Sequence, residues 1–288
     1  MDFNLTLIDP PAARHTHFLF ELAKMIAYGI EDLGHSCTLR RNVTEPNRTN
    51  ILLGAHNLTA PETVDELIDS RHPYIVYQTE IIRGSTINGS SLNGQFSTLF
   101  LPLLQNAKAV WDTEAESIAA LKALGIATQK LGFGYTPRLE EVRHRDEKDI
   151  DFFFYGSMTP HRQEVLTKLR GLGYQVAVIF DDAAMFRNDL LSRSEVVLTL
   201  RQSEKFAHLP QARILYLINN RCLVAGESGL GQEPLEDLFL WSEPDQVIEL
   251  LRRTRAMKNR RELAGDFHER FKERPMTSHL EPLIEALQ

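Results

Sequence analysis

The sequence predicts an α/β protein made of two doubly wound domains. Its 288 residues exceed the usual span of one domain, which is roughly 100 to 200 residues. A unit in which an amphipathic helix ends at glycine and leads directly into a short apolar strand occurs three times. The strand pattern also starts afresh at Asp151, after a charged stretch. These observations together favour parallel sheets covered by helices, in two successive domains.

The composition is that of an ordinary globular protein, with 43% hydrophobic and 25% charged residues. A net charge of -7 disfavours general affinity for nucleic acid or anionic membranes. The N-terminal residues lack a basic region and a long apolar run, and no stretch approaches the roughly 18 apolar residues of a membrane helix. We therefore expect a cytoplasmic protein without an integral membrane segment. Cys37 and Cys222 lie in apolar surroundings, which predicts two small core residues and no disulfide.

The repeated unit defines the helix ends. It spans residues 27–39, 121–131 and 166–179. In each copy the glycine stands just after the last helical turn, where the backbone adopts a positive φ that a Cβ disfavours. These glycines are Gly34, Gly125 and Gly173.

The elements of the first domain alternate between strand and helix, which predicts a Rossmann-like domain over residues 1–137. Strands are expected at residues 4–8, 37–40, 50–53, 74–77, 109–111 and 128–131. Helices are expected at residues 16–33, 61–69, 95–105 and 113–124.

A charged stretch from Pro137 to Ile150 has no sustained apolar period and is interpreted as a solvated connection between domains. The second Rossmann-like domain is predicted over residues 150–265. Its strands are expected at residues 151–157, 176–180, 196–200, 222–225 and 238–241, and its helices from 160 and at 183–191, 210–219 and 245–255. A last helical region over 257–287 is broken near Pro275, and residues 266–288 are expected to form a bracing helix.

The turn from Tyr155 to Arg162 is the first candidate site. It follows a buried strand and opens a helix at Pro160, so the backbone around Gly156 and Ser157 can face a phosphate. His161 and Arg162 lie in the first helical turn, where basic residues oppose the helix dipole unless an anion is near. The alternative is an ordinary tight turn with solvated basic side chains.

A second group of polar residues follows the strand that ends near Leu200. The carboxyl ends of parallel strands are where open α/β sheets bind ligands. Arg201 and Lys205 could hold a diphosphate, His208 could lie near a sugar, and Glu227 could accept hydrogen bonds from a hydroxyl group. Glu204 and Arg213 complete the set, and a plain surface role is the alternative for each residue.

The candidate catalytic residues lie in the first domain. Glu80 follows the apolar run YIVYQ and precedes a polar segment rich in glycine and asparagine, so it could act as a general base toward a hydroxyl group. His15 and His17 flank the loop after the first strand and are further candidates. The alternatives are an N-cap or ion-pair role for Glu80 and helix capping around Thr16.

Several segments of the sequence resemble those of a known protein family. FFFYGSMTPHR and ARILYLINNRCLVAGES resemble the donor lobe of GT-B glycosyltransferases, particularly the bacterial group 1-like branch, and LGHSCTL resembles a step near the start of such enzymes. The closing FHERFKERPMTSHLEPLIEAL looks like their final helix, which crosses back to the first domain. The resemblance implies two Rossmann-like domains facing a cleft and transfer of a hexose-like sugar from a nucleotide sugar to an acceptor.

One position departs from the family pattern. Retaining members often carry two glutamates separated by seven residues in the donor lobe; Glu204 matches the first, and Ala212 stands at the second. The resemblance therefore leaves open whether the configuration is retained or inverted. It also leaves open a noncatalytic nucleotide-sugar-binding or scaffold protein, and a GT-B epimerase or phosphorylase.

Other classes are disfavoured. No G-x-G-x-x-G follows the first strand of either half, which argues against a dinucleotide-dependent oxidoreductase, and no Walker A motif is present. No cluster of His, Cys or carboxylate residues has ligand spacing. We therefore expect no metal and no cofactor, with the nucleotide sugar as substrate and the acceptor, whether glycan, lipid-linked, protein or small molecule, unassigned.

Overall fold

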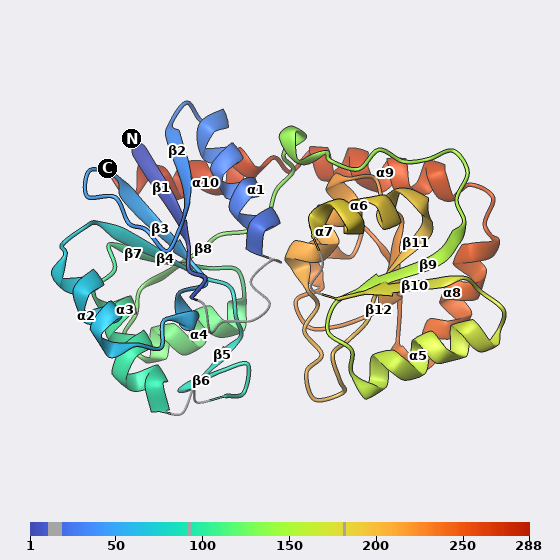
Figure 1. Cartoon of the computed structure of the whole chain (residues 1–288), viewed down its shortest axis with the longest axis horizontal. Helices are drawn as coiled ribbons and strands as arrows, with labels where there is room; N and C mark the ends of the chain where they lie inside the picture. The colour runs from blue at the N-terminus through green and yellow to red at the C-terminus, as the bar shows by residue number, and fades with distance from the viewer. Residues whose placement is uncertain (11–18, 91–93, 181–182) are drawn as a thin grey trace. The chain divides into compact units, whose positions relative to one another are not determined.

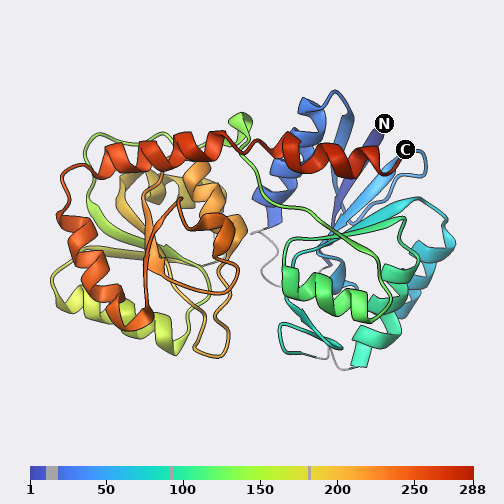
Figure 2. The same ribbon diagram turned by 180° about the vertical axis from the view of Figure 1, so that it is seen from behind.

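The computed structural model describes residues 1–10, 19–90, 94–180 and 183–288, so His15 and His17 lie outside the described residues. The chain forms two compact units, shown from the two sides in Figures 1 and 2. Unit 1 comprises Met1–Gly134 together with Met276–Gln288, and unit 2 comprises Tyr135–Pro275. The C-terminal segment therefore belongs to the first unit.

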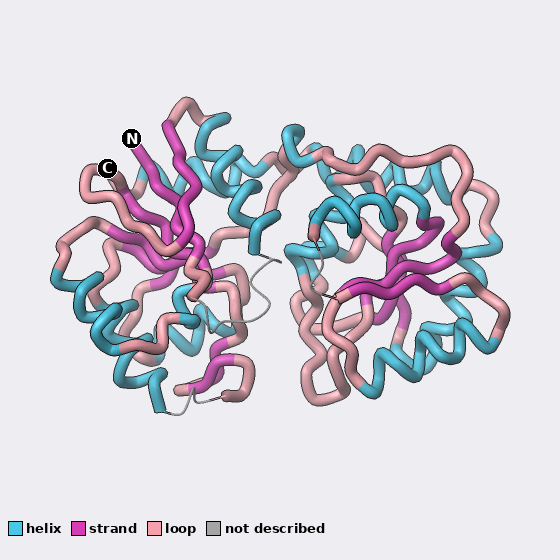
Figure 3. The backbone as a smooth tube through the Cα atoms, in the orientation of Figure 1, coloured by secondary structure: helices cyan, strands magenta, loops and turns pink. Residues whose placement is uncertain are grey.

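Unit 1 contains a six-stranded parallel sheet in the order β2-β1-β3-β4-β7-β8. Its strands are β1 (Asp2–Leu7), β2 (Ser36–Arg41), β3 (Thr49–Leu53), β4 (Tyr74–Gln78), β7 (Ala109–Asp112) and β8 (Thr128–Lys130). The central strands β3 and β4 are buried along their whole length, as expected for a parallel sheet covered on both faces. Figure 3 shows the sheet in magenta.

Helices cover both faces of this sheet. They are α1 (Leu19–Asp32), α2 (Pro61–Asp69), α3 (Leu101–Gln105), α4 (Ala115–Ala123) and α10 (Met276–Glu285), with η1 (Ala55–Asn57) after β3 and a π-helical turn η3 (Phe96–Phe100) before α3. α10 packs closely on α1, because a Cβ on Gly29 would approach side-chain atoms of Met276 and Leu280 to 2.7 Å. This contact fixes the end of the chain on unit 1.

Unit 2 contains a five-stranded parallel sheet in the order β10-β9-β11-β12-β13. Its strands are β9 (Ile150–Tyr155), β10 (Val176–Ile179), β11 (Ser194–Thr199), β12 (Val224–Glu227) and β13 (Leu240–Ser242). Its helices are α5 (Pro160–Gly171), α6 (Ala184–Arg193), α7 (Gln211–Asn219), α8 (Val247–Ala256) and α9 (Arg260–Lys272), with short turns η4 (Pro137–Leu139), η5 (Glu233–Leu235) and η6 (Pro244–Gln246). In Figure 1, α5 and α8 lie on one face of the sheet and α6, α7 and α9 on the other.

The strand order in each sheet indicates where a ligand is expected to bind. In unit 1 the order reverses at β1 and β3, and in unit 2 it reverses at β9 and β11. Open α/β sheets bind ligands outside the carboxyl ends of the strands at such reversals. The polar residues that follow β3 and β4, and those that follow β9, β11 and β12, therefore lie where a ligand is expected to bind.

The repeated helix–glycine–strand unit is confirmed. The three glycines after α1, α4 and α5 have φ values of +81°, +80° and +88°. Cys222 is buried and Cys37 is half-buried, and both are free thiols.

The segment from Pro137 to Ile150 is largely exposed, as expected, but it belongs to unit 2 and is attached to it by hydrogen bonds. The Asn220 side chain accepts from the amides of Glu141 and Val142 at 2.6 and 2.9 Å, and Lys148 Nζ donates to the carbonyl of Ser194 at 2.6 Å. The high charge of the segment hid these attachments, each of which joins a side chain to a backbone group.

One feature was not expected: the segment after Glu80 contains a hairpin, β5 (Ile82–Arg83) and β6 (Thr86–Ile87), where a polar loop was expected. The last helical region is broken near Pro275 as expected, with α9 in unit 2 and α10 in unit 1. Tyr135 pairs with Pro275 in a parallel bridge, so both passages between the units leave unit 2 at the same place.

Candidate functional site

The candidate site of unit 2 begins at the turn between β9 and α5. Gly156 has a φ of +139°, a conformation that side-chain-bearing residues rarely adopt. Thr159 caps α5, because its side chain accepts from the amide of Arg162, and Pro160 occupies the first helical turn. The local sequence thus brings His161 to the start of a 12-residue helix at the reversal of strand order.

Glu227 is the centre of this site. It is the last residue of β12, and its side chain is completely buried. One carboxylate oxygen lies 2.7 Å from Nε2 of His161, and the other accepts from the backbone amide of Arg201 at 2.7 Å. Gly226 permits this approach of β12 to β11, because a Cβ there would overlap the carbonyl of Thr199. Glu227 therefore joins the ends of three strands.

Arg162 is directed into the protein. It is 6% exposed, and its guanidinium donates to the carbonyls of Leu200 at 3.0 Å and of Ser157 at 2.8 Å. Burial lowers its pKa to about 10, assisted by the charge of Arg213 and opposed by that of Glu227. Its bonds tie the turn after β9 to the end of β11.

Arg201 is also engaged within the protein. Its Nε donates to the carbonyl of Ser228 at 2.6 Å, and one terminal nitrogen donates to the Ser228 hydroxyl at 3.0 Å. The carboxylate of Glu243 lies 3.9 Å away. The side chain is nevertheless 19% exposed, so part of it remains accessible to solvent.

Arg213, from α7, differs from these two arginines. Among the described residues its Nη1 atom is buried and has no hydrogen-bond partner. The guanidinium lies against Gly156, where a Cβ would come within 3.0 Å of both terminal nitrogens, and it stacks 5.1 Å from the centre of the Tyr155 ring. Burial lowers the pKa of Arg213, while Tyr155 raises it and the nearby Arg187 lowers it further. This is a cation with an unsatisfied donor beside the turn expected to face a phosphate.

The other predicted donor residues lie on the loop between β11 and α7. Glu204 and Lys205 are exposed, whereas His208 is buried, forms a bridge to Leu230 and contacts the Phe206 ring at 5.3 Å. The structure therefore brings seven of the ten predicted donor residues together at the strand ends and places the other three on this loop. The seven are Gly156, Ser157, His161, Arg162, Arg201, Arg213 and Glu227.

In unit 1, Glu80 lies just after β4 on a backbone that is firmly held. The buried Gln78 side chain accepts from the amides of Thr79 and Glu80 at 2.9 and 3.0 Å and donates to the Glu80 carbonyl. The Glu80 carboxylate accepts a hydrogen bond from Asn88, in the turn after β6, and its other oxygen lies 3.8 Å from Nε2 of His56.

Sequence reasoning missed His56 and Asp112 in this region. His56 lies in η1 directly after β3, and burial lowers its pKa although the charge of Glu80 raises it. Asp112 ends β7 and is completely buried; burial raises its pKa to about 8, because the amide bonds from Glu114 and Thr113 only partly offset desolvation. Both follow an apolar strand, which is the signal that identified Glu80 and could have identified them.

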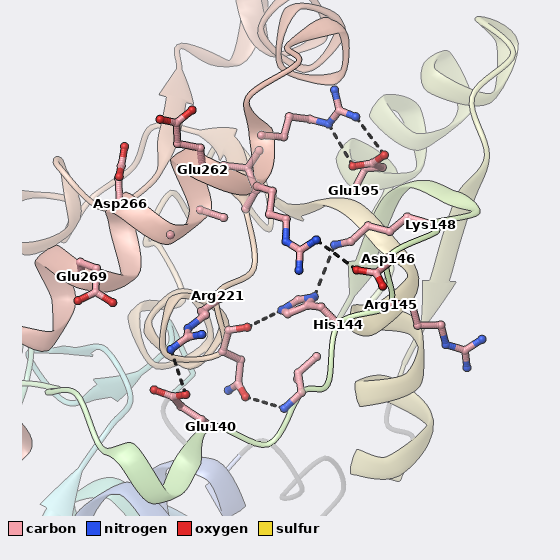
Figure 4. A pocket seen from close by; sticks show the side chains of 17 residues that line it. Glu140, His144, Arg145, Asp146, Lys148, Glu195, Arg221, Glu262, Asp266 and Glu269 are labelled. Carbon is pink, nitrogen blue, oxygen red and sulfur yellow. Dashed lines mark hydrogen bonds and ion pairs between the residues drawn. The ribbon is translucent and has the colours of Figure 1, made fainter.

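A separate cavity of about 630 Å³ lies in unit 2 (Figure 4). Its lining includes Lys148, Glu195 and Leu223, which lie at or before the amino ends of β9, β11 and β12, so it opens at the opposite edge of the sheet from His161 and Glu227. Figure 4 shows Glu262, Asp266 and Glu269 along α9 on one side of it. Its charges are mixed, and several form ion pairs with one another, such as Arg260 with Glu195.

The described residues contain no group of three or more His, Cys, Asp or Glu residues placed to hold a metal ion. No helix among them is long and apolar enough to cross a bilayer.

Comparison with known proteins decides the fold. No protein-family model matches the chain, and no curated protein sequence matches it. Solved structures do: T4 phage BGT in complex with UDP and Mn²⁺ superimposes with a TM-score of 0.60 at 9% identity, covering 100% of both chains. The chain has the GT-B fold.

Two further GT-B structures are similar over the whole chain. AviGT4, a glycosyltransferase involved in avilamycin A biosynthesis, has a TM-score of 0.57 at 14% identity and covers 99% of this chain and 96% of its own. OtsA has a TM-score of 0.59 at 10% identity, with 100% and 99% coverage. The expected pair of Rossmann-like domains is thus confirmed, and at these identities the likeness concerns the fold.

Proposed function

We propose that this protein is a glycosyltransferase that moves a sugar from a nucleotide-sugar donor to an acceptor hydroxyl group without a metal ion. The observation that carries the proposal is the buried, unsatisfied donor of Arg213 beside Gly156, at the reversal of strand order in unit 2. A buried polar group without a partner is costly, so its presence at a ligand-binding edge favours an anionic ligand. The similarity to glycosyltransferases, one of them bound to UDP-glucose, indicates which anion to test first.

In this proposal unit 2 binds the nucleoside diphosphate of the donor. Negative charge grows on the diphosphate as the bond to the sugar breaks, and groups already in place stabilise it most effectively. Arg213, Lys205 and the partly exposed Arg201 would supply positive charge, and the amides at the start of α5 would supply hydrogen bonds. This set of groups takes the place of a metal ion.

His161 and Glu227 have distinct tasks here. Both oxygens of Glu227 already accept hydrogen bonds, and the carboxylate is completely buried, so Glu227 acts through its neighbours. The His161 ring is 25% exposed and is held by Glu227 through Nε2. His161 is therefore the member of this pair that can face the donor.

The first experiment measures binding and turnover separately. We expect UDP or another nucleoside diphosphate to bind in the presence of EDTA, measured by isothermal titration calorimetry, and the sugar of the matching nucleotide sugar to be transferred or hydrolysed under the same conditions. Loss of activity in EDTA that Mn²⁺ restores would contradict the metal-independent proposal. Binding without any turnover would favour a noncatalytic nucleotide-sugar-binding protein.

The second experiment tests the residues. Arg213→Ala and Lys205→Ala should lower kcat by about 10- to 1,000-fold while raising KM less, because their charges matter most as the diphosphate leaves. Lys168→Ala is the matched control, since Lys168 is exposed and pairs with the exposed Glu164 on the same helix. Near-normal turnover in both Arg213→Ala and Lys205→Ala would contradict the proposal that these residues bind the diphosphate.

A further inference from the structure

The carboxyl edge of the sheet in unit 1 carries a histidine–carboxylate pair. His56 follows β3 and Glu80 follows β4, two strands that are neighbours in the sheet, and β3 borders the reversal of strand order. Gly54 makes this placement possible: its φ is +81°, and a Cβ would lie 3.1 Å from the carbonyl of Ile8. The turn at Gly54 therefore directs the chain so that His56 lies beside Glu80.

Glu80 is held so that one carboxylate oxygen is directed to His56. Its backbone is fixed by Gln78 and by the Ser117 hydroxyl, which donates to the Glu80 carbonyl at 3.3 Å. Asn88, at a φ of +51°, binds the other oxygen, and its own side chain is anchored by the amide of Ile81 at 3.0 Å. An ordinary surface glutamate would not require a backbone clamp and an anchored amide.

The surroundings of His56 favour a neutral imidazole. Burial lowers the pKa of His56, and the charged group facing it among the described residues is Glu80. At the end of β7, burial raises the pKa of Asp112 to about 8, and the charge of Glu80 adds to this rise, so Asp112 is neutral near pH 7. Glu114, whose charge acts on Asp112, is the next acid along the chain.

The His56 ring has one nitrogen left for a substrate. Nε2 faces Glu80, and the described residues offer Nδ1 no hydrogen-bond partner. The side chains of His56 and Glu80 are 17% and 15% exposed, so a substrate hydroxyl can reach them. A neutral ring with Nε2 protonated toward a carboxylate has its basic lone pair on Nδ1.

We propose that His56 is the group that removes the proton from the acceptor hydroxyl, and that Glu80 is a positioning residue that orients the ring and stabilises its charged form. This rests on the proposed glycosyltransferase function and assigns its base. It replaces the expectation that Glu80 accepts the proton directly.

The acceptor O–H proton passes to Nδ1 of His56 while the oxygen lone pair forms a bond to the anomeric carbon. The bond from that carbon to the diphosphate oxygen breaks, and its electron pair leaves with the diphosphate. A base that activates the attacking hydroxyl on the face opposite the leaving group inverts the anomeric configuration. The proposal therefore also predicts an inverting transferase.

The first test needs no turnover. The His56 ring is titrated by NMR in the wild-type protein and in Glu80→Gln, with assignment by His56→Asn. We expect the His56 midpoint to fall in Glu80→Gln, because the carboxylate that favours the charged ring is gone. An unchanged midpoint would overturn the pairing whether or not the protein transfers sugar.

The second test uses the active enzyme with its donor at saturation. His56→Asn should lower kcat by about 100- to 10,000-fold and abolish the acidic limb of the kcat–pH profile, whereas Glu80→Gln should lower kcat less and move that limb to lower pH. His72→Asn is the matched control in unit 1, since His72 contacts Thr44 away from the pair. Nucleotide affinity should stay within twofold in all three variants, because the donor residues belong to unit 2.

Two outcomes would overturn the assignment. One is a His56→Asn enzyme that keeps its acidic limb while Glu80→Gln loses activity, which would make Glu80 the base. The other is a product with the same anomeric configuration as the donor. A wild-type protein that binds nucleotide sugars without turnover would instead refute the proposed function and leave the NMR result to stand alone.

Discussion

Replacing Glu227 by alanine tests whether this carboxylate holds the ends of the unit 2 strands together. The change removes the acceptor of the Arg201 amide and of His161, both at 2.7 Å. A hydrogen bond to an ionised group contributes about 1.5–3 kcal/mol, and a buried donor left unpaired costs about 1–3 kcal/mol. Because the His161 ring is 25% exposed and water can replace its partner, only the amide bond is counted in full. We expect Glu227→Ala to lower the free energy of unfolding of unit 2 by about 2–4 kcal/mol.

Hydrogen–deuterium exchange measured by mass spectrometry can assign this loss to unit 2. Peptides around β11 and β12 should exchange about 10-fold faster for each 1.4 kcal/mol lost, while peptides of unit 1 serve as the internal reference. Glu227→Gln should lose less stability, since an amide oxygen can still accept a hydrogen bond from the Arg201 amide. Glu204→Ala, which replaces an exposed loop glutamate, should change the exchange rates little. Exchange in Glu227→Ala within threefold of the wild type would refute the reasoning.

Three further changes have defined outcomes. Gly156→Ala should weaken nucleoside diphosphate binding at least severalfold by displacing Arg213, whereas Gly173→Ala, with φ of +88° and no atom within 4 Å, should add backbone strain without changing calorimetric affinity. Asp112 keeps its proton in the folded protein up to about pH 8 but loses it near pH 4 in the unfolded chain. Its contribution to the free energy of unfolding therefore falls, between these pH values, by at most about 1.4 kcal/mol per pH unit. Asp112→Asn should flatten this decline in urea unfolding titrations carried out from pH 5 to 7. Asn220→Ala should destabilise unit 2 by about 1–3 kcal/mol in the same urea assay, because two partly buried amides lose their acceptor, and a change below about 0.5 kcal/mol would show that these bonds do not hold residues 137–150 on unit 2.

The fold could be predicted because its signals are local. The glycines that end α1, α4 and α5 require a positive φ, and the apolar runs before Gly54 and Gly156 require burial on both faces. Such signals depend on a few adjacent residues and can be recognised without knowing which distant residues pack against them. The β5–β6 hairpin lacks them, since each strand has only two residues and its turn resembles an ordinary polar loop.

The candidate site was predictable in position but less so in the task of each side chain. Polar residues after apolar strands identified His161, Arg201 and Glu227, and the structure places them together. The sequence could not show that Arg162 and Arg201 donate to backbone carbonyls, because those carbonyls belong to residues distant along the chain. The donor of Arg213 that stays unsatisfied among the described residues is equally a property of three-dimensional packing.

The same limit explains why His56 escaped notice while Glu80 did not. Both follow apolar strands, but Glu80 precedes a glycine- and asparagine-rich segment, whereas His56 lies in a short turn that leads into an ordinary amphipathic helix. A histidine becomes a proton acceptor through its neighbours, and here the neighbour is 24 residues away in sequence and 3.8 Å away in space. Burial keeps the imidazole neutral and the carboxylate compensates its charge once a proton arrives, so the pair gains its chemistry from the adjacency of β3 and β4.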